Sequence, residues 1–219
     1  MTGPAPAPPA VPKSASALRL IGTLGGFGAL AGLLIVAAFT ATQPRIRANK
    51  AAALAAAIGE VLGAPDRYDT LYVSGDALSR DLPTGQTAET AEAVYLGWRD
   101  SLPIGYAVVA SGSGFQDNIK LLIGYDPATS RLIGMTVLES KETPGLGDKI
   151  YKDTTFGAQF SQVTAPLVGV KTGQGTGRPN ELVMITGATI SSRAVIKAIN
   201  TTLERVGPLL LAHQKELPQ

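Results

Sequence analysis

A short turn rich in hydroxyl side chains separates an apolar segment from an amphipathic one near the C-terminus. Residues 186–189 read Thr-Gly-Ala-Thr, and Thr189 is followed closely by Ser191 and Ser192. Residues 182–185 are apolar and predict a short buried strand, whereas the apolar spacing after the turn predicts a helix. The first turn of a helix has unpaired N–H groups and a positive partial charge, so this place suits a phosphate. The plainer alternative is that Ser191 or Ser192 only caps the helix.

A second stretch with unusual backbone requirements lies in the middle of the chain. Residues 141–149 read Lys-Glu-Thr-Pro-Gly-Leu-Gly-Asp-Lys, which predicts a loop because of its proline and two glycines. Gly145 and Gly147 would let a ligand approach the backbone closely, or they form a rigid turn without a ligand. Lys149 could neutralise a phosphate, or it is simply a solvated lysine.

Two aromatic residues elsewhere in the chain are further candidates for such a site. Tyr106 and Phe115 could stack on a ring system, and they are equally candidates for the hydrophobic core. Arg193, just after the serines, is expected on the surface of the final helix.

The composition excludes several classes of chemistry. The 219 residues include no cysteine, which excludes thiolate-bound clusters, disulfides and thiol catalysis. A single histidine, His213, argues against a histidine-based metal site and a Ser-His-Asp triad, and it is expected at the surface near a helix end. The net charge is only +2, and acidic and basic residues balance after the first 44 residues, so no nucleic-acid partner is expected.

The N-terminal part predicts a membrane anchor. Residues 1–18 are rich in Pro and Ala and predict a disordered tail, and residues 20–41 contain no charge over a length that can span a bilayer. Residues 19–43 are therefore expected to form a transmembrane helix, with Gly28 and Gly32 allowing another helix to approach. A cleaved signal peptide is the alternative, and basic residues on both sides leave the orientation undecided.

The rest of the chain predicts an α+β domain. Residues 44–65 have high helix propensity and predict a helical stem, and residues 66–219 form the main domain. The pairing of residues 66–100 is not assigned. Short turns join three later strands into an antiparallel meander, so the sheet is expected to be mostly antiparallel and flanked by helices. The expected strands are residues 104–110, 119–125, 131–139 and 166–171, and the expected helices are residues 153–160 and about 192–213.

Three of these features together closely resemble a known family. They are the single N-terminal span, the Glu-Thr-Pro-Gly-Leu-Gly-Asp-Lys string at residues 142–149, and the Thr-Gly-Ala-Thr turn that opens the last helix. The chain resembles the G subunit of the Rnf complex, also called Rsx, a membrane-bound ferredoxin:NAD oxidoreductase. The C subunit of the sodium-translocating NADH:quinone reductase is related to it. The resemblance covers residues 19 to about 210.

The resemblance implies a specific cofactor and a specific role. It implies that FMN is attached covalently to Thr189 through a phosphoester, by a flavin transferase that uses FAD and magnesium. It further implies an electron-relay subunit that works with other membrane subunits of the complex and has no catalytic residues or metal of its own. The main domain would face the periplasm, from an anchor in the inner membrane, and the tail would be cytoplasmic.

The expected binding residues come from the turn and from the loop. The turn contributes Thr186, Gly187, Ala188, Ile190, Ser191 and Ser192, and the loop contributes Glu142, Thr143, Gly145, Leu146, Gly147 and Lys149. Two positions depart from the family pattern. Val183 stands where the attachment motif usually has an acidic residue, Glu181 being expected on the other face of the strand, and Ser140 stands where the family often has histidine.

Two other functions remain open at this point. One is a membrane-tethered binding module without flavin, in which the Thr186 turn is an ordinary helix start, and Val183 favours that alternative. A flavin-binding periplasmic protein outside any complex is the other, although the glycines of the membrane span indicate a helix partner.

Overall fold

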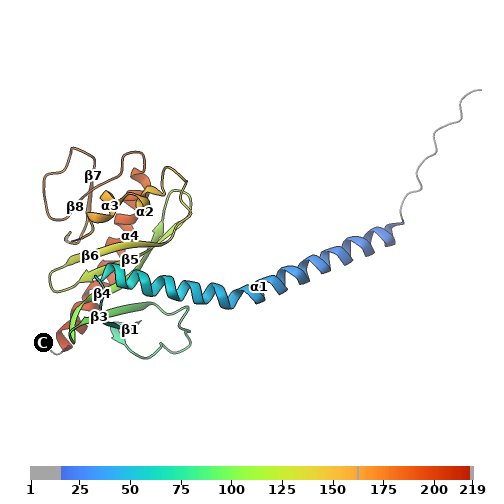
Figure 1. The fold of residues 1–219 in the computed structure, drawn as a ribbon, viewed down its shortest axis with the longest axis horizontal. Coiled ribbons are helices and arrows are strands. Elements are labelled where there is room, and N and C mark those ends of the chain that lie inside the picture. Colours follow the sequence, from blue (N-terminus) through green and yellow to red (C-terminus); the bar gives the residue numbers. More distant parts are fainter. Residues whose placement is uncertain (1–15, 162, 218–219) are drawn as a thin grey trace, which may run out of the picture. The chain divides into compact units, whose positions relative to one another are not determined.

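The structure is a computed structural model that describes residues 16–161 and 163–217. Almost all of the expected N-terminal tail, residues 1–18, lies outside the described residues. The chain divides into two units, Met1–Lys50 and Ala51–Gln219, which are considered separately below (Figure 1).

The first unit consists, within the described residues, of the helix α1, which spans Ala17–Val61 and so continues into the second unit. This helix contains a window of 18 residues with a mean hydropathy of 2.1, and none of that window is buried. By length and composition α1 can cross a membrane, which fits a single-pass anchor. The helix runs through Pro44, so the expected span and stem are parts of one helix, which ends just before Gly63 at a φ of +66°.

The second unit is built on a six-stranded antiparallel sheet in the order β2-β1-β3-β4-β5-β6. The sheet contains the expected meander of β4, β5 and β6, extended by strands from the region whose pairing was not assigned. The strands are β1 (Arg67–Ser74), β2 (Ala77–Ser79), β3 (Ala93–Arg99), β4 (Leu102–Ser113), β5 (Asn118–Asp126) and β6 (Arg131–Glu139).

The remaining elements follow β6 in the chain. Two short helices precede a two-stranded parallel sheet, and a long helix ends the domain. These elements are α2 (Lys149–Lys152), α3 (Thr154–Ala158), β7 (Val168–Val170), β8 (Glu181–Val183) and α4 (Thr189–Glu216). The prediction that the last helix begins near Ser192 was therefore about one turn too late.

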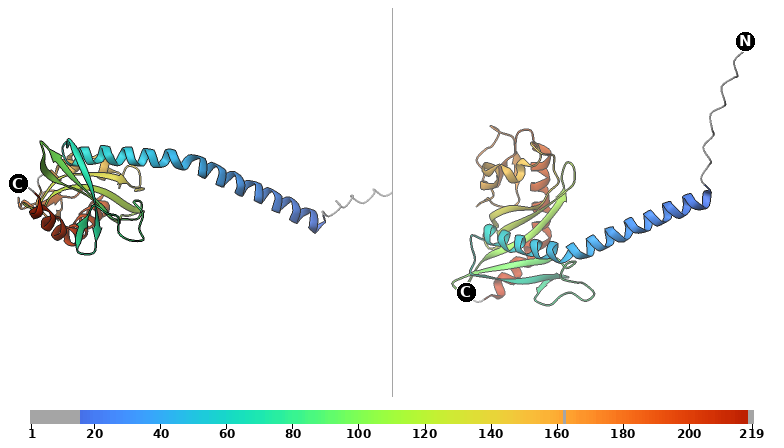
Figure 2. Two further views of the ribbon diagram at one scale, coloured as in Figure 1. Left: turned by 90° about the horizontal axis from the view of Figure 1, so that it is seen from below. Right: turned by 45° about the vertical axis from the view of Figure 1, so that its right-hand side comes forward.

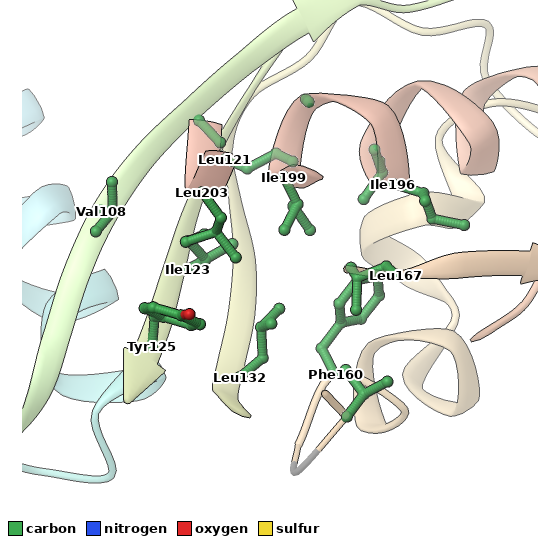
Figure 3. Close-up of a cluster of buried hydrophobic side chains, with 14 of the residues drawn as sticks. Val108, Leu121, Ile123, Tyr125, Leu132, Phe160, Leu167, Ile196, Ile199 and Leu203 are labelled. Carbon is green, nitrogen blue, oxygen red and sulfur yellow. The ribbon is translucent and has the colours of Figure 1, made fainter. Parts of the chain in front are cut away.

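The sheet buries both of its faces. Along β5 the side chains alternate, so that Leu121 and Ile123 belong to one hydrophobic cluster and Leu122 belongs to the other. The first cluster includes Ile199 and Leu203 of α4, which lie over the sheet as Figure 3 shows. The second cluster includes the end of α1, and Figure 2 shows these last turns and α4 on opposite faces of the sheet.

The end of α1 packs against two paired glycines of the sheet. Gly124 of β5 lies opposite Gly134 of β6. A Cβ at Gly124 would overlap the carbonyl oxygen of Val61, and a Cβ at Gly134 would lie 3.2 Å from the same oxygen. A side chain at Gly124 would therefore push the helix away from the sheet. This close approach is what lets Ile58 and Val61 become buried at 0% and 1% exposure.

Tyr106 and His213 form a hydrogen bond between β4 and the end of α4. The tyrosine hydroxyl lies 2.9 Å from Nδ1 of His213, and the tyrosine side chain is fully buried. Tyr106 is thus part of the core and does not face a ligand. His213 is half-buried and bonded, so the expectation of an ordinary surface histidine was wrong.

We expect Gly124→Ala to destabilise the main domain. The added Cβ would overlap the Val61 carbonyl group, and overpacking of this kind costs about 1–3 kcal/mol in free energy of unfolding. Thermal unfolding of the full chain in detergent, followed by circular dichroism, measures the change. Gly157→Ala is the matched control, since a Cβ there meets no atom within 4 Å. An equal midpoint for the two variants would contradict this account of α1 packing.

We expect His213 to make the folded domain less stable as the pH falls below about 6.5, its ordinary pKa. Burial lowers the pKa of His213 in the folded protein, and Arg80 adds to this while Glu216 opposes it. The unfolded chain then binds the proton first, so stability is present above the ordinary pKa and is lost as the pH falls through the folded pKa.

Because the chain has a single histidine, its NMR ring signals need no residue assignment. An NMR titration of the His213 ring protons gives the folded pKa directly, and Tyr106→Phe is a companion variant that removes the hydrogen bond. A folded pKa at or above the ordinary value would contradict the predicted direction.

Candidate functional site

The turn before α4 presents the start of a helix without a side-chain cap. Gly187 has a φ of +84°, which only glycine adopts at low cost, and it turns the chain from β8 toward α4. Ala188 is the N-cap and makes no side-chain hydrogen bond, so the plainer alternative, in which Ser191 or Ser192 caps the helix, does not hold. The backbone N–H groups of Thr189, Ile190 and Ser191 lie in the first turn, before the first helical hydrogen bond.

The hydroxyl groups near the helix start have different surroundings. Ser192 is fully buried, donates its hydroxyl to the carbonyl oxygen of Ala188 at 2.9 Å, and accepts from the N–H of Ile185 at 3.1 Å. Its own N–H donates to Ala188 as well, so Ser192 offers a ligand neither group, which corrects the prediction for this residue. Ser191 is 2% exposed and donates its hydroxyl to Glu142.

Thr189 differs from both serines. It is half-buried, and its hydroxyl has one long contact, 3.5 Å to the carbonyl oxygen of Ile185. Thr186 is exposed and lies 3.3 Å from the hydroxyl of Thr172. Among the three residues of the first helical turn that carry a hydroxyl, Thr189 is therefore the least buried.

Glu142 does not face outward, contrary to its expected contact with a ligand. Its side chain is 5% exposed, and Oε1 accepts hydrogen bonds from the N–H groups of Phe115 at 2.9 Å and Gln116 at 3.1 Å. Oε2 accepts from the Ser191 hydroxyl. Burial acts to raise the pKa of Glu142, but these hydrogen bonds and that of Asp117 together lower the pKa below its ordinary value, so the carboxylate is ionised.

The rest of the loop surrounds this carboxylate and remains partly exposed. Thr143 donates its hydroxyl to the side-chain oxygen of Gln116 at 3.0 Å, and Gly145 lies at the surface with a φ of +79°. Leu146 is exposed, whereas Gly147 is buried against Glu142. The close approach that was expected at Gly147 is thus made by the protein's own side chains.

A groove of about 770 Å³ borders the turn, within the range of roughly 300–1,000 Å³ that is typical of ligand pockets. Lys149 and Lys152 line this groove together with residues 183–186 and Thr172. Lys152 also pairs with Asp148 at 2.6 Å, and this neighbour lowers the pKa of the Asp148 carboxyl. Two cations beside apolar side chains suit a molecule that has both a phosphate and an aromatic ring.

Several residues of this groove were not found from the sequence. Lys152, Thr172 and Gln159 belong to segments that looked like ordinary helix and loop. Gln159 holds the backbone of Val183 with two hydrogen bonds, of 2.7 Å and 3.2 Å.

Phe115, the other aromatic candidate, is exposed, and its backbone N–H donates to the Glu142 carboxylate.

Val183 lines the groove, and Glu181 lies on the same face of β8, opposite the buried Leu182. The expectation that Glu181 lies on the other face from Val183 was therefore wrong, because residues two apart on a strand share a face. The Glu181 carboxylate is held by Thr176 and by the N–H of Gly177 at 3.1 Å.

Comparison with known proteins identifies the family. The FMN-binding domain model matches residues 114–204, which include the Glu142 loop and the Thr189 turn. The G subunit of the ion-translocating oxidoreductase complex of Vibrio cholerae serotype O1 (strain ATCC 39315 / El Tor Inaba N16961) is 30% identical over 199 residues, which are 89% of this chain and 90% of that protein. The chain belongs to the family of G subunits of ion-translocating oxidoreductase complexes.

A second relative agrees with this assignment, and a solved structure shares the fold. The G subunit of the Na(+)-translocating ferredoxin:NAD(+) oxidoreductase complex of Acetobacterium woodii is 32% identical over 115 residues, 51% of this chain and 53% of that protein. The crystal structure of Shewanella oneidensis NqrC superposes with a TM-score of 0.61 at 16% identity, covering 78% of this chain and all of that one. The α+β fold expected from the sequence is confirmed, and the relatives of this family are parts of multi-subunit complexes.

The described residues fit FMN, the group that this domain family binds. The hydroxyl of the half-buried Thr189, the free N–H groups of the first helical turn and the two lysines of the groove all favour a phosphate. The apolar side chains of Val183, Met184 and Phe156 line the same groove.

Proposed function

We propose that this chain is an electron-relay subunit of a membrane-bound, ion-translocating ferredoxin:NAD oxidoreductase, and that it carries FMN in a phosphoester to Thr189. The observation that supports this attachment site is that Thr189 is only half-buried, whereas Ser191 and Ser192 beside it are buried. A phosphoester needs a hydroxyl oxygen that a second protein can reach. Ser191 and Ser192 are buried and hydrogen-bonded, so Thr189 is the acceptor in the first turn.

The attachment is a transfer of the FMN part of FAD, catalysed by a separate flavin transferase. The Thr189 Oγ1 atom forms a new bond to the phosphorus of the FMN part, and the pyrophosphate P–O bond to AMP breaks. AMP leaves, and the hydroxyl proton of Thr189 passes to solvent. The chain contributes the acceptor and its position, because Thr189 has no basic side chain bonded to it among the described residues.

Once attached, FMN supplies one- and two-electron chemistry, and the chain supplies the surroundings. The N–H groups of Ile190 and Ser191 at the start of α4 hold the phosphate, and Lys149 balances its charge from the groove wall. Leu146 and Phe115 are exposed on the loops beside this helix start and offer apolar contact. Thr186, Gly187 and Ala188 set the direction from which the helix begins.

The anchor and the cofactor together suggest how the subunit works. Residues 19–43 cross the inner membrane, residues 44–65 form the stem and residues 66–219 form the FMN-binding domain on the periplasmic side. The described residues hold no cluster of three or more potential metal ligands, and the chain has no cysteine. The match to the FMN-binding domain supports FMN as the electron carrier, and electrons come from and pass to other membrane subunits of the complex.

A membrane-tethered binding module without flavin is the second candidate. It is favoured by Val183, which stands where the family motif usually places an acid and which is 38% exposed in the groove. If the acid helps the transferase to recognise its substrate, the chain would be modified poorly or not at all.

We expect Thr189→Val to abolish covalent flavin. Valine keeps the size and branching of threonine but lacks the oxygen that would form the ester, while Thr189→Ser keeps the oxygen and should retain some flavin. Full-length chains are produced together with a flavin transferase, and flavin fluorescence is read from the denatured band on a gel. Thr201→Val, an exposed threonine on the same helix, is the matched control.

Three outcomes separate the candidates. Fluorescence in denatured Thr189→Val would show that the attachment site is elsewhere, and Ser191→Ala and Ser192→Ala would then identify a competing serine. If Thr189→Val has no fluorescence, both serine variants should still carry detectable flavin on Thr189, in a reduced amount for Ser191→Ala. A natural-sequence chain without flavin, made beside an active transferase, would favour the binding module.

We expect the main domain to lie outside the cytoplasm. A reporter enzyme that is active only in the cytoplasm, fused after Gln219, should be silent, whereas one that is active only in the periplasm should function. A fusion before Met1 is the paired control, and it should give the opposite pattern. Cytoplasmic activity of the C-terminal fusion would reverse the proposed orientation.

A further inference from the structure

Glu142 is a buried carboxylate without a cationic partner. It is 5% exposed, and it makes no ion pair within the part of the chain that the structure describes. Its neighbour Lys141 pairs instead with Asp117, at 2.9 Å. A buried charge is costly unless its hydrogen bonds are satisfied, so the bonds to this carboxylate must account for its presence.

Those bonds join three segments that are distant in the sequence. One oxygen accepts from Phe115 and Gln116 in the turn between β4 and β5, and the other accepts from Ser191 in the first turn of α4. The carboxylate itself belongs to the loop after β6. It therefore sits at the positive end of α4, where an anion is stabilised by the helix dipole.

Two glycines make room for this arrangement. A Cβ at Gly114 would overlap Oε1 of Glu142, and a Cβ at Gly147 would overlap Oε2. A Cβ at Gly147 would also lie 2.8 Å from the Ser191 hydroxyl oxygen. The carboxylate occupies a cradle that only glycine at both positions allows.

The bond to Ser191 has a consequence for Thr189. Side chains two residues apart on a helix project about 200° from each other, because each residue turns the helix by about 100°. Holding Ser191 inward against Glu142 therefore turns Thr189 toward the other side, where it is half-exposed. The same bond keeps the Ser191 hydroxyl away from any reagent.

We propose that Glu142 is a positioning residue that selects Thr189 over Ser191 as the site of flavin attachment. This inference rests on the proposed attachment of FMN to the first turn of α4. Glu142 acts through Ser191 and through the turn at residues 114–117, and no contact joins it to Thr189 among the described residues. Its role is thus to fix the helix start and to withhold the competing hydroxyl.

The test compares Glu142→Ala and Glu142→Gln in the full-length chain produced with a flavin transferase. Alanine removes all the hydrogen bonds, whereas glutamine keeps an oxygen for the two N–H groups and an amide that can donate to Ser191. Glu92→Gln is the matched control: Glu92 pairs with Arg205 of α4 at 2.6 Å and 2.7 Å, far along the helix from Thr189. Intact mass gives the flavin per chain, and peptide mass gives the modified residue.

We expect Glu142→Ala to lower flavin loading by at least about tenfold, since misplacing a reacting group by 1 Å can cost about 10²-fold. Part of the remaining flavin should appear on Ser191. Glu142→Gln should load within about twofold of the unchanged chain and on Thr189 alone, as rescue by a conservative variant requires. Glu92→Gln should load normally.

Two results would overturn the proposal. One is loading and site choice in Glu142→Ala equal to those of Glu92→Gln, and the other is a loss in Glu142→Gln as large as that in Glu142→Ala. If Glu142→Ala does not accumulate in membranes, Ser191→Ala is tested in its place, because this variant removes only the hydrogen bond between Glu142 and α4. That variant should load severalfold less on Thr189, and unchanged loading would overturn the proposal equally.

The failure of this inference can be told apart from failure of the proposed function. If Thr189→Val has no covalent flavin but Glu142→Ala loads normally, only the proposed role of Glu142 is refuted. Flavin retained by Thr189→Val would instead remove the attachment site on which this inference rests.

Discussion

The candidate site depends on one buried carboxylate. Glu142 holds the turn between β4 and β5, the loop after β6 and the first turn of α4 together, and no two of these segments are adjacent in the sequence. Its charge is stabilised by N–H groups, a hydroxyl and a helix end, and so it needs no cation. The helix start is thereby already occupied by an anion on one side, which leaves the Thr189 side for a phosphate.

The sheet provides the rigid body on which these loops meet. The end of α1 covers one face through Ile58 and Val61, and α4 covers the other through Val195, Ile199 and Leu203. Because α4 also carries Thr189, the core that fixes this helix fixes the attachment point as well. Contacts far from Thr189, such as the Glu92–Arg205 pair and the Tyr106–His213 bond, hold the later turns of the same helix.

The sequence predicted the parts of this fold that have a clear hydrophobic pattern or clear turn residues at their ends. Apolar segments separated by short turns marked β4, β5 and β6, the uncharged run marked the membrane-anchor helix, and the final amphipathic segment marked α4. Residues 66–100 were not assigned because β1 and β3 are held by partners across the sheet, which a local pattern does not show. The start of α4 was placed too late because Thr189 and Ile190 are weak helix formers, and the helix nevertheless begins at Thr189 with Ala188 as its N-cap.

The candidate site was likewise predicted only in part. The family strings located the loop and the turn, but they could not show that Glu142 points inward or that Ser192 is fully engaged. Those facts depend on which segments meet in space. The half-buried position of His213 was likewise missed, because the bond between Tyr106 and His213 joins residues 107 positions apart.

The glycine cradle around Glu142 has an evolutionary consequence. Neither Gly114 nor Gly147 can gain a side chain while a full-length glutamate occupies the space between them. Loss of the glutamate would leave the Ser191 hydroxyl and the N–H groups of Phe115 and Gln116 without their acceptor. Positions 114, 142, 147 and 191 are therefore physically coupled. Substitutions at these four positions are expected to appear together in a lineage, even where the surrounding loops diverge.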